Sequence, residues 1–427
     1  MKNPRFTALK TLQKVAHGEF IQDAFDRKGL NPKDERLAET IINGTVQHEL
    51  FLDYVIDQFV SNTDKLQANL RILLRMSIYQ IRFLDRVPNR AIVDESVKIA
   101  KKIANQGAGG LVNGVLRSII REGDDAFKIK TDDDITYLSL RYSFSEEWVK
   151  YFKTLLGNDA EKFLASTFNP APITIRPIHT NKQELQISLE EEGFELSDAE
   201  VGETALNVEN PQGLFDSKAF HNGHFYVQDG ASQEVVSLFT RDVKAEALDL
   251  CAAPGGKSFQ MAEIFHHVLS CDSNGERLKL MDENIKRLGY ENITTQVRNA
   301  KTPLPKKTYD RILVDAPCSG LGLLRRKPEI KHRVTLDDVL RLALTQRLIL
   351  ENAYHALATG GELVYSTCTV TVEENEGVLA SFLKDHPECT LRSKGIRYWP
   401  HQKNCDGFSM AVIVRKDDYA LDGNDAQ

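Results

Sequence analysis

The sequence has few cysteines, and it lacks the spacings that give cysteines a structural role. Six occur among 427 residues, all in the C-terminal half, and none forms a Cys-x-x-Cys pair. This excludes a disulfide framework and disfavours a zinc site, so we expect reduced thiols and no metal ion. No apolar run approaches the ~18 residues that span a bilayer, and the first residues contain no apolar leader core. We therefore expect a cytoplasmic protein with no membrane partner.

The sequence also lacks the net positive charge of a typical nucleic-acid-binding protein, since its formal net charge is −7. Basic residues exceed acidic ones within residues 1–130, whereas the remainder is acidic. Two basic clusters stand out in that remainder, at 301–307 and 325–333. A local patch can bind phosphate although the whole chain is negative; the alternative is that both clusters are ordinary solvated charges.

Length and pattern predict three domains and a tail. Residues 1–128 carry apolar side chains at helical spacing and show no strand alternation, which predicts a compact helical domain. Residues 129–225 predict a small α/β module of short strands and an acidic helix. Residues 226–418 alternate strands with helices, and residues 419–427 form a short acidic tail.

In residues 226–418 the alternation predicts a parallel, doubly wound sheet. The expected strands are Ala247–Leu250, His267–Cys271, Arg311–Val314, Gly361–Tyr365 and Phe408–Val414. Ligands of such sheets bind beyond the carboxyl ends of the strands, so the residues at those ends form the candidate site.

A glycine loop follows the first strand, in the run Cys251-Ala-Ala-Pro-Gly-Gly-Lys257-Ser258. Glycines let the backbone approach a ligand, the next helix N-terminus favours an anion, and Asp272 beyond the second strand suits ribose hydroxyls. These features favour an adenosine-containing cofactor. A nicotinamide enzyme is disfavoured because Gly-x-Gly-x-x-Gly is absent, and a phosphate-binding loop fails because Cys251 occupies its first glycine position. A plain tight turn remains the alternative.

Two cysteines follow the third and fourth strands, in Asp315-Ala-Pro-Cys318-Ser-Gly and Ser366-Thr-Cys368-Thr. In the predicted topology both face the cofactor crevice, whereas a lone cysteine is usually a small buried hydrophobe. Such a pair suits covalent catalysis on a pyrimidine, where a thiolate adding at carbon 6 makes carbon 5 nucleophilic. The chemistry alone leaves open which cysteine attacks.

The second basic cluster directly follows the first of these cysteine motifs. A basic loop beside a base pocket suits the backbone of a nucleic acid. The residues from which we expect such contacts are Arg325, Arg326, Lys327, Lys331 and Arg333.

Together the three motifs resemble the Sun family of RNA cytosine-C5 methyltransferases. The region around Gly110–Arg117 is similar to a NusB-type RNA-binding domain. The resemblance implies an α/β fold: a Rossmann-like S-adenosylmethionine methyltransferase domain, an all-helical NusB-like N-terminal domain and a small α/β linking module. It also implies methylation of carbon 5 of a specific cytosine in small-subunit (16S) ribosomal RNA, with S-adenosylmethionine as cofactor.

The resemblance assigns roles to individual residues. Cys368 would be the nucleophile, Cys318 would release the product, and Asp315 would contact the base with Lys257 nearby. Asn299 departs from the family, whose members often carry an acid at this position near the adenine. The implied cofactor contacts are Cys251, Ala252, Ala253, Pro254, Gly255, Gly256, Lys257, Asp272, Asn299 and Asp315.

Two other functions compete with this interpretation: a non-catalytic RNA-binding assembly factor, and a nucleotide hydrolase built on the near phosphate loop. A scaffold would not need both cysteines together with Asp315 and Lys257, which favours the enzyme. Binding of S-adenosylmethionine rather than ATP would separate the enzyme from the hydrolase. We expect a monomer, since no dimerisation stripe is evident.

Overall fold

The computed structural model describes residues 3–305, 307–393 and 395–416. The predicted tail at 419–427 and Lys306 of the first basic cluster lie outside the described residues. The chain forms two compact units, each built from two segments: Met1–Phe168 with Arg326–Arg333, and Asn169–Arg325 with Val334–Gln427. Among the described residues, no helix is long and apolar enough to cross a membrane.

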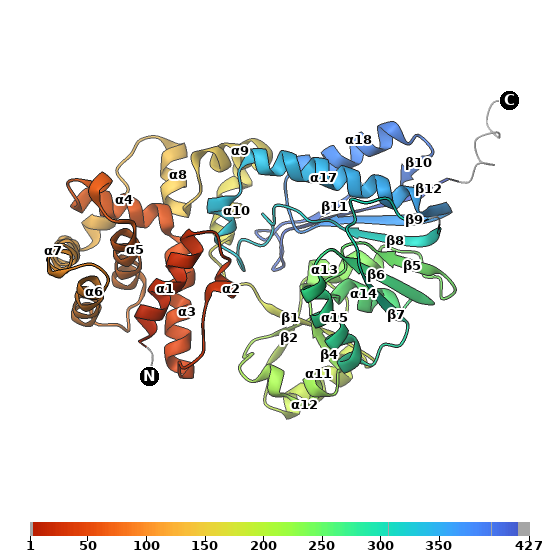
Figure 1. The fold of residues 1–427 in the computed structure, drawn as a ribbon, viewed down its shortest axis with the longest axis horizontal. Helices are drawn as coiled ribbons and strands as arrows, with labels where there is room; N and C mark the ends of the chain where they lie inside the picture. Colours follow the sequence, from red (N-terminus) through yellow and green to blue (C-terminus); the bar gives the residue numbers. More distant parts are fainter. Residues whose placement is uncertain (1–2, 306, 394, 417–427) are drawn as a thin grey trace. The chain divides into compact units, whose positions relative to one another are not determined.

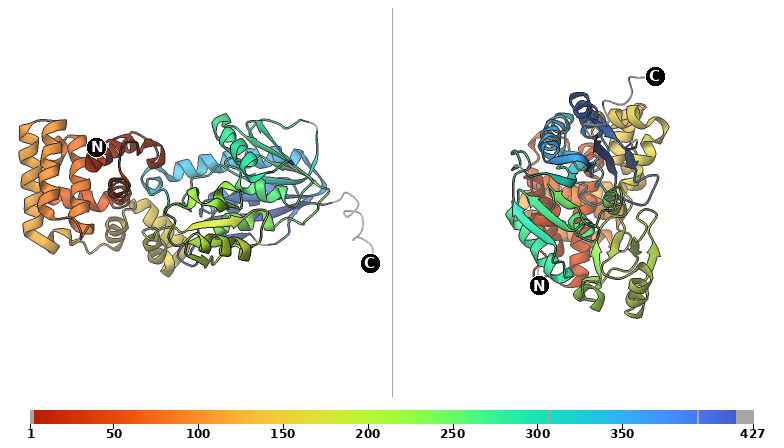
Figure 2. Two further views of the ribbon diagram at one scale, coloured as in Figure 1. Left: turned by 90° about the horizontal axis from the view of Figure 1, so that it is seen from below. Right: turned by 90° about the vertical axis from the view of Figure 1, so that its right-hand side faces the viewer.

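The first unit is a bundle of helices; its residues 3–168 are coloured red to yellow in Figures 1 and 2. Asn3-Pro4 and Asn31-Pro32 begin two of them, because each asparagine side chain accepts hydrogen bonds from two backbone amides of the first turn. Leu9, Ile41 and Leu52 are fully buried in the shared core. The helices are α1 (Pro4–Ala16), α2 (Ile21–Ala24), α3 (Pro32–Gln47), α4 (Glu49–Phe59), η1 (Thr63–Lys65), α5 (Ala68–Phe83), α6 (Asn89–Ile103), α7 (Gln106–Glu122), η2 (Gly123–Phe127), α8 (Asp134–Tyr142), α9 (Glu146–Leu156), η3 (Gly157–Asp159), α10 (Ala160–Ser166) and α16 (Ile330–Arg333).

The helical unit extends beyond its predicted boundary at residue 128. Helices α8, α9 and α10 follow that boundary, and their core contains Trp148, Phe152 and Phe163. The Phe152 ring centroid lies 5.7 Å from that of Trp148 and 4.5 Å from that of Phe163. This segment was expected in the small α/β module. A helical pattern does not show in which unit a helix packs; the contacts of α8 with α4 place this segment in the helical unit.

The small α/β module lies in the second unit, between Ile173 and Val227. Its four antiparallel strands have the order β2-β3-β1-β4, and Ile175, Leu189 and Phe225 are fully buried in its core. The elements are β1 (Ile173–Pro177), α11 (Lys182–Glu191), β2 (Leu196–Asp198), β3 (Leu206–Val208), η4 (Leu214–Asp216), α12 (Lys218–His221) and β4 (Phe225–Val227).

An eight-stranded sheet forms the rest of the second unit, in the order β10-β12-β9-β8-β5-β6-β7 with β11 paired to β12. The strands from β9 to β7 are parallel, as predicted. The prediction is wrong for β12, the expected strand Phe408–Val414, which pairs antiparallel with β9 and also with β10 and β11, two strands that were not predicted. No helix among the described residues separates β10, β11 and β12, so short connections let them pair antiparallel. The strands are β5 (Glu246–Asp249), β6 (His267–Asp272), β7 (Ile293–Val297), β8 (Tyr309–Asp315), β9 (Leu357–Thr367), β10 (Cys389–Leu391), β11 (Ile396–Tyr398) and β12 (Phe408–Arg415).

Helices cover both faces of this sheet (Figure 1). On one face lie α13 (Gly230–Ser237), α14 (Gly256–Ala262) and α15 (Gly275–Leu288). On the other lie α17 (Leu336–His355), which leads directly into β9, and α18 (Val378–Asp385), which follows β9 through the π-helical turn η5 (Glu373–Gly377). Alternate residues of β8 enter the two cores: Ile312 and Val314 pack with α17, and Leu313 packs on the opposite side. The Rossmann-like arrangement is thereby confirmed.

Candidate active site

The two motif cysteines meet at the carboxyl ends of β8 and β9. These strands are neighbours, and Asp315 is in register with Ser366. The loops that follow therefore start side by side, and the sulfur atoms of Cys318 and Cys368 lie 3.2 Å apart. The hydrogen bond with Cys368 and burial together raise the pKa of the Cys318 thiol well above its usual range. The structure thus brings together the cysteines that sequence reasoning paired.

Asp315 lies beside this pair, and both of its oxygen atoms are held. Its Oδ2 accepts a hydrogen bond from Lys257 Nζ at 2.7 Å, and its Oδ1 accepts one from Ser366 Oγ at 2.7 Å. The ammonium of Lys257 also lies 5.1 Å from the centroid of the Phe408 ring. The predicted positive charge of Lys257 therefore acts on the Asp315 carboxylate and fixes its direction.

The glycine loop connects β5 to α14 as a tight turn. Gly255 has φ +112°, and a Cβ added there would lie 2.4 Å from the Phe259 side chain, so a larger residue does not fit. Beneath the loop, the fully buried Asp249 carboxylate accepts a 2.7 Å hydrogen bond from Ser258 Oγ. Burial raises the pKa of Asp249 to about 7.

Asp272 ends β6 and orients its carboxylate with backbone donors. The amide of Ala253 donates to Oδ2 at 3.1 Å, and the amide of Asn274 donates to Oδ1 at 2.9 Å. Arg277 NH1 lies 3.8 Å from Oδ2. The second strand end and the glycine loop are thus linked through one nearly buried carboxylate.

These strand ends enclose a cavity of about 560 Å³. Most of the predicted cofactor and catalytic residues either line it or, like Lys257, bond to a residue that does. From the prediction, the cavity is lined by Cys251, Ala253, Asp272, Asn299, Asp315, Cys318 and Cys368. Further lining residues, absent from the prediction, include Arg277, Leu342, Thr345 and Ile349. Among the described residues, no group of three or more His, Cys, Asp or Glu side chains could hold a metal ion.

Sequence reasoning missed the side chains behind the cysteine loops. Glu374 and Asn375 stand in η5 and are almost completely buried, as is Gln346 of α17. The signal that could have found them is the polar run Glu373-Glu-Asn-Glu376, placed directly after the Cys368 motif and before an apolar helix. A solvated turn does not require three acids and an amide, so this run could have indicated a further role for these residues.

The second basic cluster does not lie in this cavity. Its residues from Arg326 to Arg333 belong to the helical unit. Lys331 is 3% exposed, and its Nζ donates to the backbone carbonyls of Gln47 at 2.7 Å and Tyr142 at 3.0 Å. Burial lowers the pKa of Lys331 to about 7. The prediction that Lys331 contacts nucleic acid is therefore wrong, because its ammonium is enclosed by protein.

Arg333 is used in the same way. Its guanidinium donates to the carbonyls of Gly18 at 3.0 Å and Val15 at 2.8 Å, and also to that of Glu19. These acceptors leave little of the guanidinium for phosphate, so the prediction for Arg333 is also contradicted. In the same cluster Lys327 lies 5.5 Å from the Phe20 ring centroid and Arg325 donates to Asn404 at 2.8 Å, whereas Arg326 is exposed.

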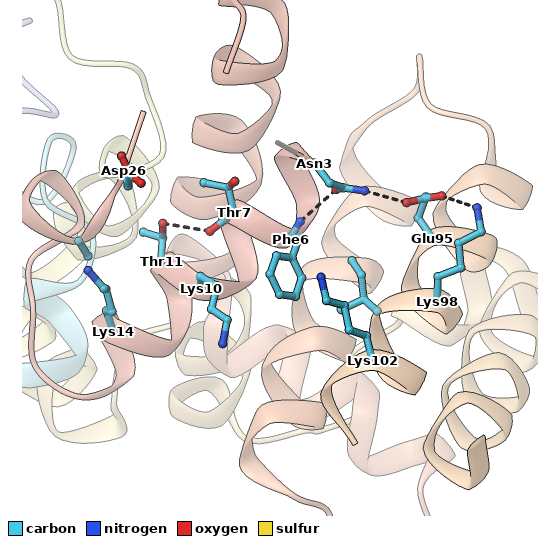
Figure 3. Close-up of a pocket in the computed structure, with 12 residues that line it drawn as sticks. Asn3, Phe6, Thr7, Lys10, Thr11, Lys14, Asp26, Glu95, Lys98 and Lys102 are labelled. Carbon is cyan, nitrogen blue, oxygen red and sulfur yellow. Dashed lines mark hydrogen bonds and ion pairs between the residues drawn. The ribbon is translucent and has the colours of Figure 1, made fainter. Parts of the chain in front are cut away.

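A larger cavity, about 680 Å³, lies in the helical unit and is lined mainly by α1 and α6 (Figure 3). Four lysines surround it: Lys10, Lys14, Lys98 and Lys102. Lys98 is paired with Glu95 at 2.7 Å, whereas Lys10 and Lys102 lie 5.7 and 4.1 Å from the ring centroid of Phe6. Among the described residues, neither of these two ammonium groups forms an ion pair.

Comparison with known proteins identifies the family. Residues 237–414 match the family model of the 16S rRNA methyltransferase RsmB/F, and residues 2–121 match the NusB family. The chain is 32% identical to the probable ribosomal RNA small subunit methyltransferase B of Bacillus subtilis over 96% of this chain and 98% of the relative. Identity to the ribosomal RNA small subunit methyltransferase B of Erwinia tasmaniensis is 30% over 97% and 99%. The crystal structure of PH0851 superposes with a TM-score of 0.81 at 25% identity, over 97% of this chain and 99% of that one. This chain therefore belongs to the RsmB/F family of small-subunit ribosomal RNA methyltransferases.

Proposed function

We propose that the protein methylates carbon 5 of a cytosine in 16S ribosomal RNA through a covalent cysteine adduct, with S-adenosylmethionine as methyl donor. The observation that carries this proposal is the pair of thiols 3.2 Å apart at the wall of a cavity that Asp272 and Asp315 also line. A methyltransferase that needed no covalent step would have no use for two sulfur atoms in contact at its reacting centre.

The cavity has the chemistry that S-adenosylmethionine requires. The Asp272 carboxylate, held by two backbone amides, suits the two hydroxyls of a ribose. Asn299 offers an amide for the adenine, and Cys251 and Ala253 of the glycine loop line the same cavity. When bound, the cofactor supplies an electrophilic methyl group. Within the same cavity, Asp272 would contact the cofactor and Asp315 the base.

The thiolate of Cys368 adds to carbon 6 of the base and forms a carbon–sulfur bond, while the ring electrons shift to make carbon 5 nucleophilic. Asp315, whose orientation is set by Lys257 and Ser366, contacts the nitrogen edge of the pyrimidine. After carbon 5 is methylated, solvent water takes its proton, the electron pair left behind re-forms the double bond between carbons 5 and 6, and the carbon–sulfur bond breaks so that Cys368 leaves as a thiolate. Cys318 lies in contact with the departing sulfur and assists this release.

Trapping the adduct tests the assignment of the two cysteines. Wild type, Cys318→Ala and Cys368→Ala are incubated with S-adenosylmethionine and small-subunit ribosomal RNA and separated on a denaturing gel. We expect Cys318→Ala to accumulate a protein–RNA adduct, and Cys368→Ala to give neither adduct nor methylated RNA. The reverse pattern would exchange the two roles. Wild type that methylates no RNA and binds no S-adenosylmethionine would overturn the proposal and favour a non-catalytic assembly factor.

We further propose that the lysine-lined cavity of the helical unit contacts the RNA backbone, in place of Lys331 and Arg333. The ammonium groups of Lys10 and Lys102 are exposed and available to phosphates. Phe6 between them provides an aromatic surface of the kind on which bases stack.

A further inference from the structure

Glu374 is a buried carboxylate that the proposed mechanism does not use. Its side chain is fully buried in the turn η5, behind the loop that carries Cys368. Burial of a carboxylate is costly unless donors surround it. Glu374 accepts four hydrogen bonds: from the Ser319 amide at 2.8 Å, Ser319 Oγ at 2.5 Å, Thr371 Oγ1 at 2.8 Å and Gln346 Nε2 at 3.0 Å.

These donors come from both cysteine loops. Ser319 directly follows Cys318, and Thr371 is three residues after Cys368. Gln346 of α17 also donates to the carbonyl of Pro317 at 3.0 Å, so the residues on either side of Cys318 are both tied to this centre. One carboxylate therefore connects the two loops whose sulfur atoms must stay in contact.

Asn375 and Ser319 reinforce the same connection. The amide of Asn375 donates to the carbonyl of Thr371 at 2.7 Å and accepts from Thr367 Oγ1 at 2.6 Å, on either side of Cys368. The hydroxyls of Ser319 and Thr369 lie 2.8 Å apart and link the loops directly. An irregular π-helical turn of the kind found at functional sites places Glu374 and Asn375 side by side for this purpose.

Glu374 also places a negative charge near the thiol pair. Together with the hydrogen bond to Cys368 and burial, this charge raises the pKa of the Cys318 thiol. A Cys318 that keeps its proton can donate it in a hydrogen bond to the sulfur of Cys368, 3.2 Å away.

We propose that Glu374 is a positioning residue that clamps the two cysteine loops together and so holds the Cys318 thiol against the sulfur of Cys368, the proposed nucleophile. This inference rests on the proposed covalent function. Glu374 touches neither reacting sulfur in the structure; it acts through Ser319, Gln346 and Thr371.

The charge is tested with Glu374→Gln, which keeps the shape of the side chain and removes its charge. In a Cys368→Ser background, alkylation of Cys318 by iodoacetamide is followed against pH. We expect the Glu374→Gln exchange to move the midpoint of this profile to lower pH, a change that simple loosening of the loops would not produce.

With Cys368 present, we expect kcat for methyl transfer to fall between about 10- and 100-fold, with little change in the Kd for S-adenosylmethionine. Glu376→Gln is the matched control, because Glu376 stands in the same turn but is exposed and paired with Arg397.

The outcomes separate this inference from the proposed function. If Cys368→Ala still methylates RNA, the covalent function itself fails. If Cys368→Ala is inactive while Glu374→Gln keeps both the wild-type kcat and the wild-type alkylation profile, the role of Glu374 alone is overturned. Should Glu374→Gln not unfold cooperatively, Ser319→Ala takes its place. That variant keeps the charge but loses one link, so we expect a lower kcat with an unchanged alkylation profile, and an unchanged kcat would overturn the proposal.

Discussion

The sequence predicted a function for both the cavity that contains the two cysteines and the basic segment 326–333. In the structure, the polar and charged side chains of these two regions have opposite surroundings. In the cavity, Asp272, Cys318 and Cys368 present polar groups to an open space of about 560 Å³. In the basic segment, Lys331 and Arg333 direct their charges into backbone carbonyls of the helical unit. A cationic side chain that is close to a cysteine motif in sequence can therefore be packed inside the other unit.

Lys257 beside the cavity and Lys331 in the basic segment show why, because their ammonium groups contact different partners. Lys257 pairs with Asp315, a charge that is itself at the cavity wall, so its ammonium serves the site. Lys331 lies 5.0 Å from the Phe144 ring centroid and 4.7 Å from that of Phe168, and its Nζ donates to two carbonyls. Carbonyls, ring faces and the nearby Glu49 carboxylate surround this ammonium, and they leave nothing of it for a phosphate to reach.

The largest effect is expected in the cavity. Cys368→Ala removes the proposed nucleophile and should lower methyl transfer by at least about 1000-fold. The rate is measured with radioactive S-adenosylmethionine under single-turnover conditions. Cys389→Ala is the control, since this buried cysteine lies in β10 and does not line the cavity. Similar losses in both variants would mean that the cavity cysteines have no special role, and the contrast with the basic segment would disappear.

A smaller effect is expected at the lysine-lined cavity of the helical unit. Reversing two charges in Lys10→Glu/Lys102→Glu should weaken RNA binding by about tenfold or more at low salt, with a smaller salt dependence. At saturating RNA kcat should be unchanged. Lys162→Glu, on the exposed surface of α10, is the matched control in a filter-binding titration. An equal loss in the control would indicate a general charge effect and not a binding surface.

The burial of Lys331 should make the free energy of unfolding depend on pH. Its pKa is lowered to about 7 in the folded protein, whereas an unfolded lysine titrates near ~10.4. Between these values the unfolded chain binds a proton that the folded chain does not, so stability rises with pH by up to about 1.4 kcal/mol per unit. Lys331→Met removes this contribution. Urea unfolding between pH 7 and 9 should therefore show a flatter slope for the variant, and identical slopes would contradict the burial of this ammonium.

The smallest effect is expected at Asn299, whose side chain lines the cavity. If its amide contacts the adenine, Asn299→Ala should raise the Kd for S-adenosylmethionine by roughly three- to tenfold, the value of one hydrogen bond. Calorimetric titration measures this directly. Asn284→Ala on the surface of α15 should leave the Kd unchanged. A Kd unaffected by the change at Asn299 would restrict cofactor recognition to the loop 251–257 and Asp272.

Much of the fold and of the site could be predicted because the ends of buried strands can be recognised from the sequence. An apolar run followed by glycine, aspartate or cysteine marks both the strand and the functional side chain, as at Cys251, Asp272 and Cys318. The helices α8 to α10 and the antiparallel strands β10 to β12 carry no such mark. Their assignment depends on what they pack against, which a local pattern does not contain.

By itself the sequence determined where the candidate residues stand: the glycine loop, Asp315 and the two cysteines each follow a buried strand. The tertiary structure alone decided how far those groups lie from each other and from water. Contacts between residues 50 or more positions apart set the 3.2 Å separation of the sulfur atoms and the Glu374 clamp behind them. The same long-range packing turned Lys331 from a surface charge into a buried one, because burial depends on the whole chain and not on neighbours in sequence.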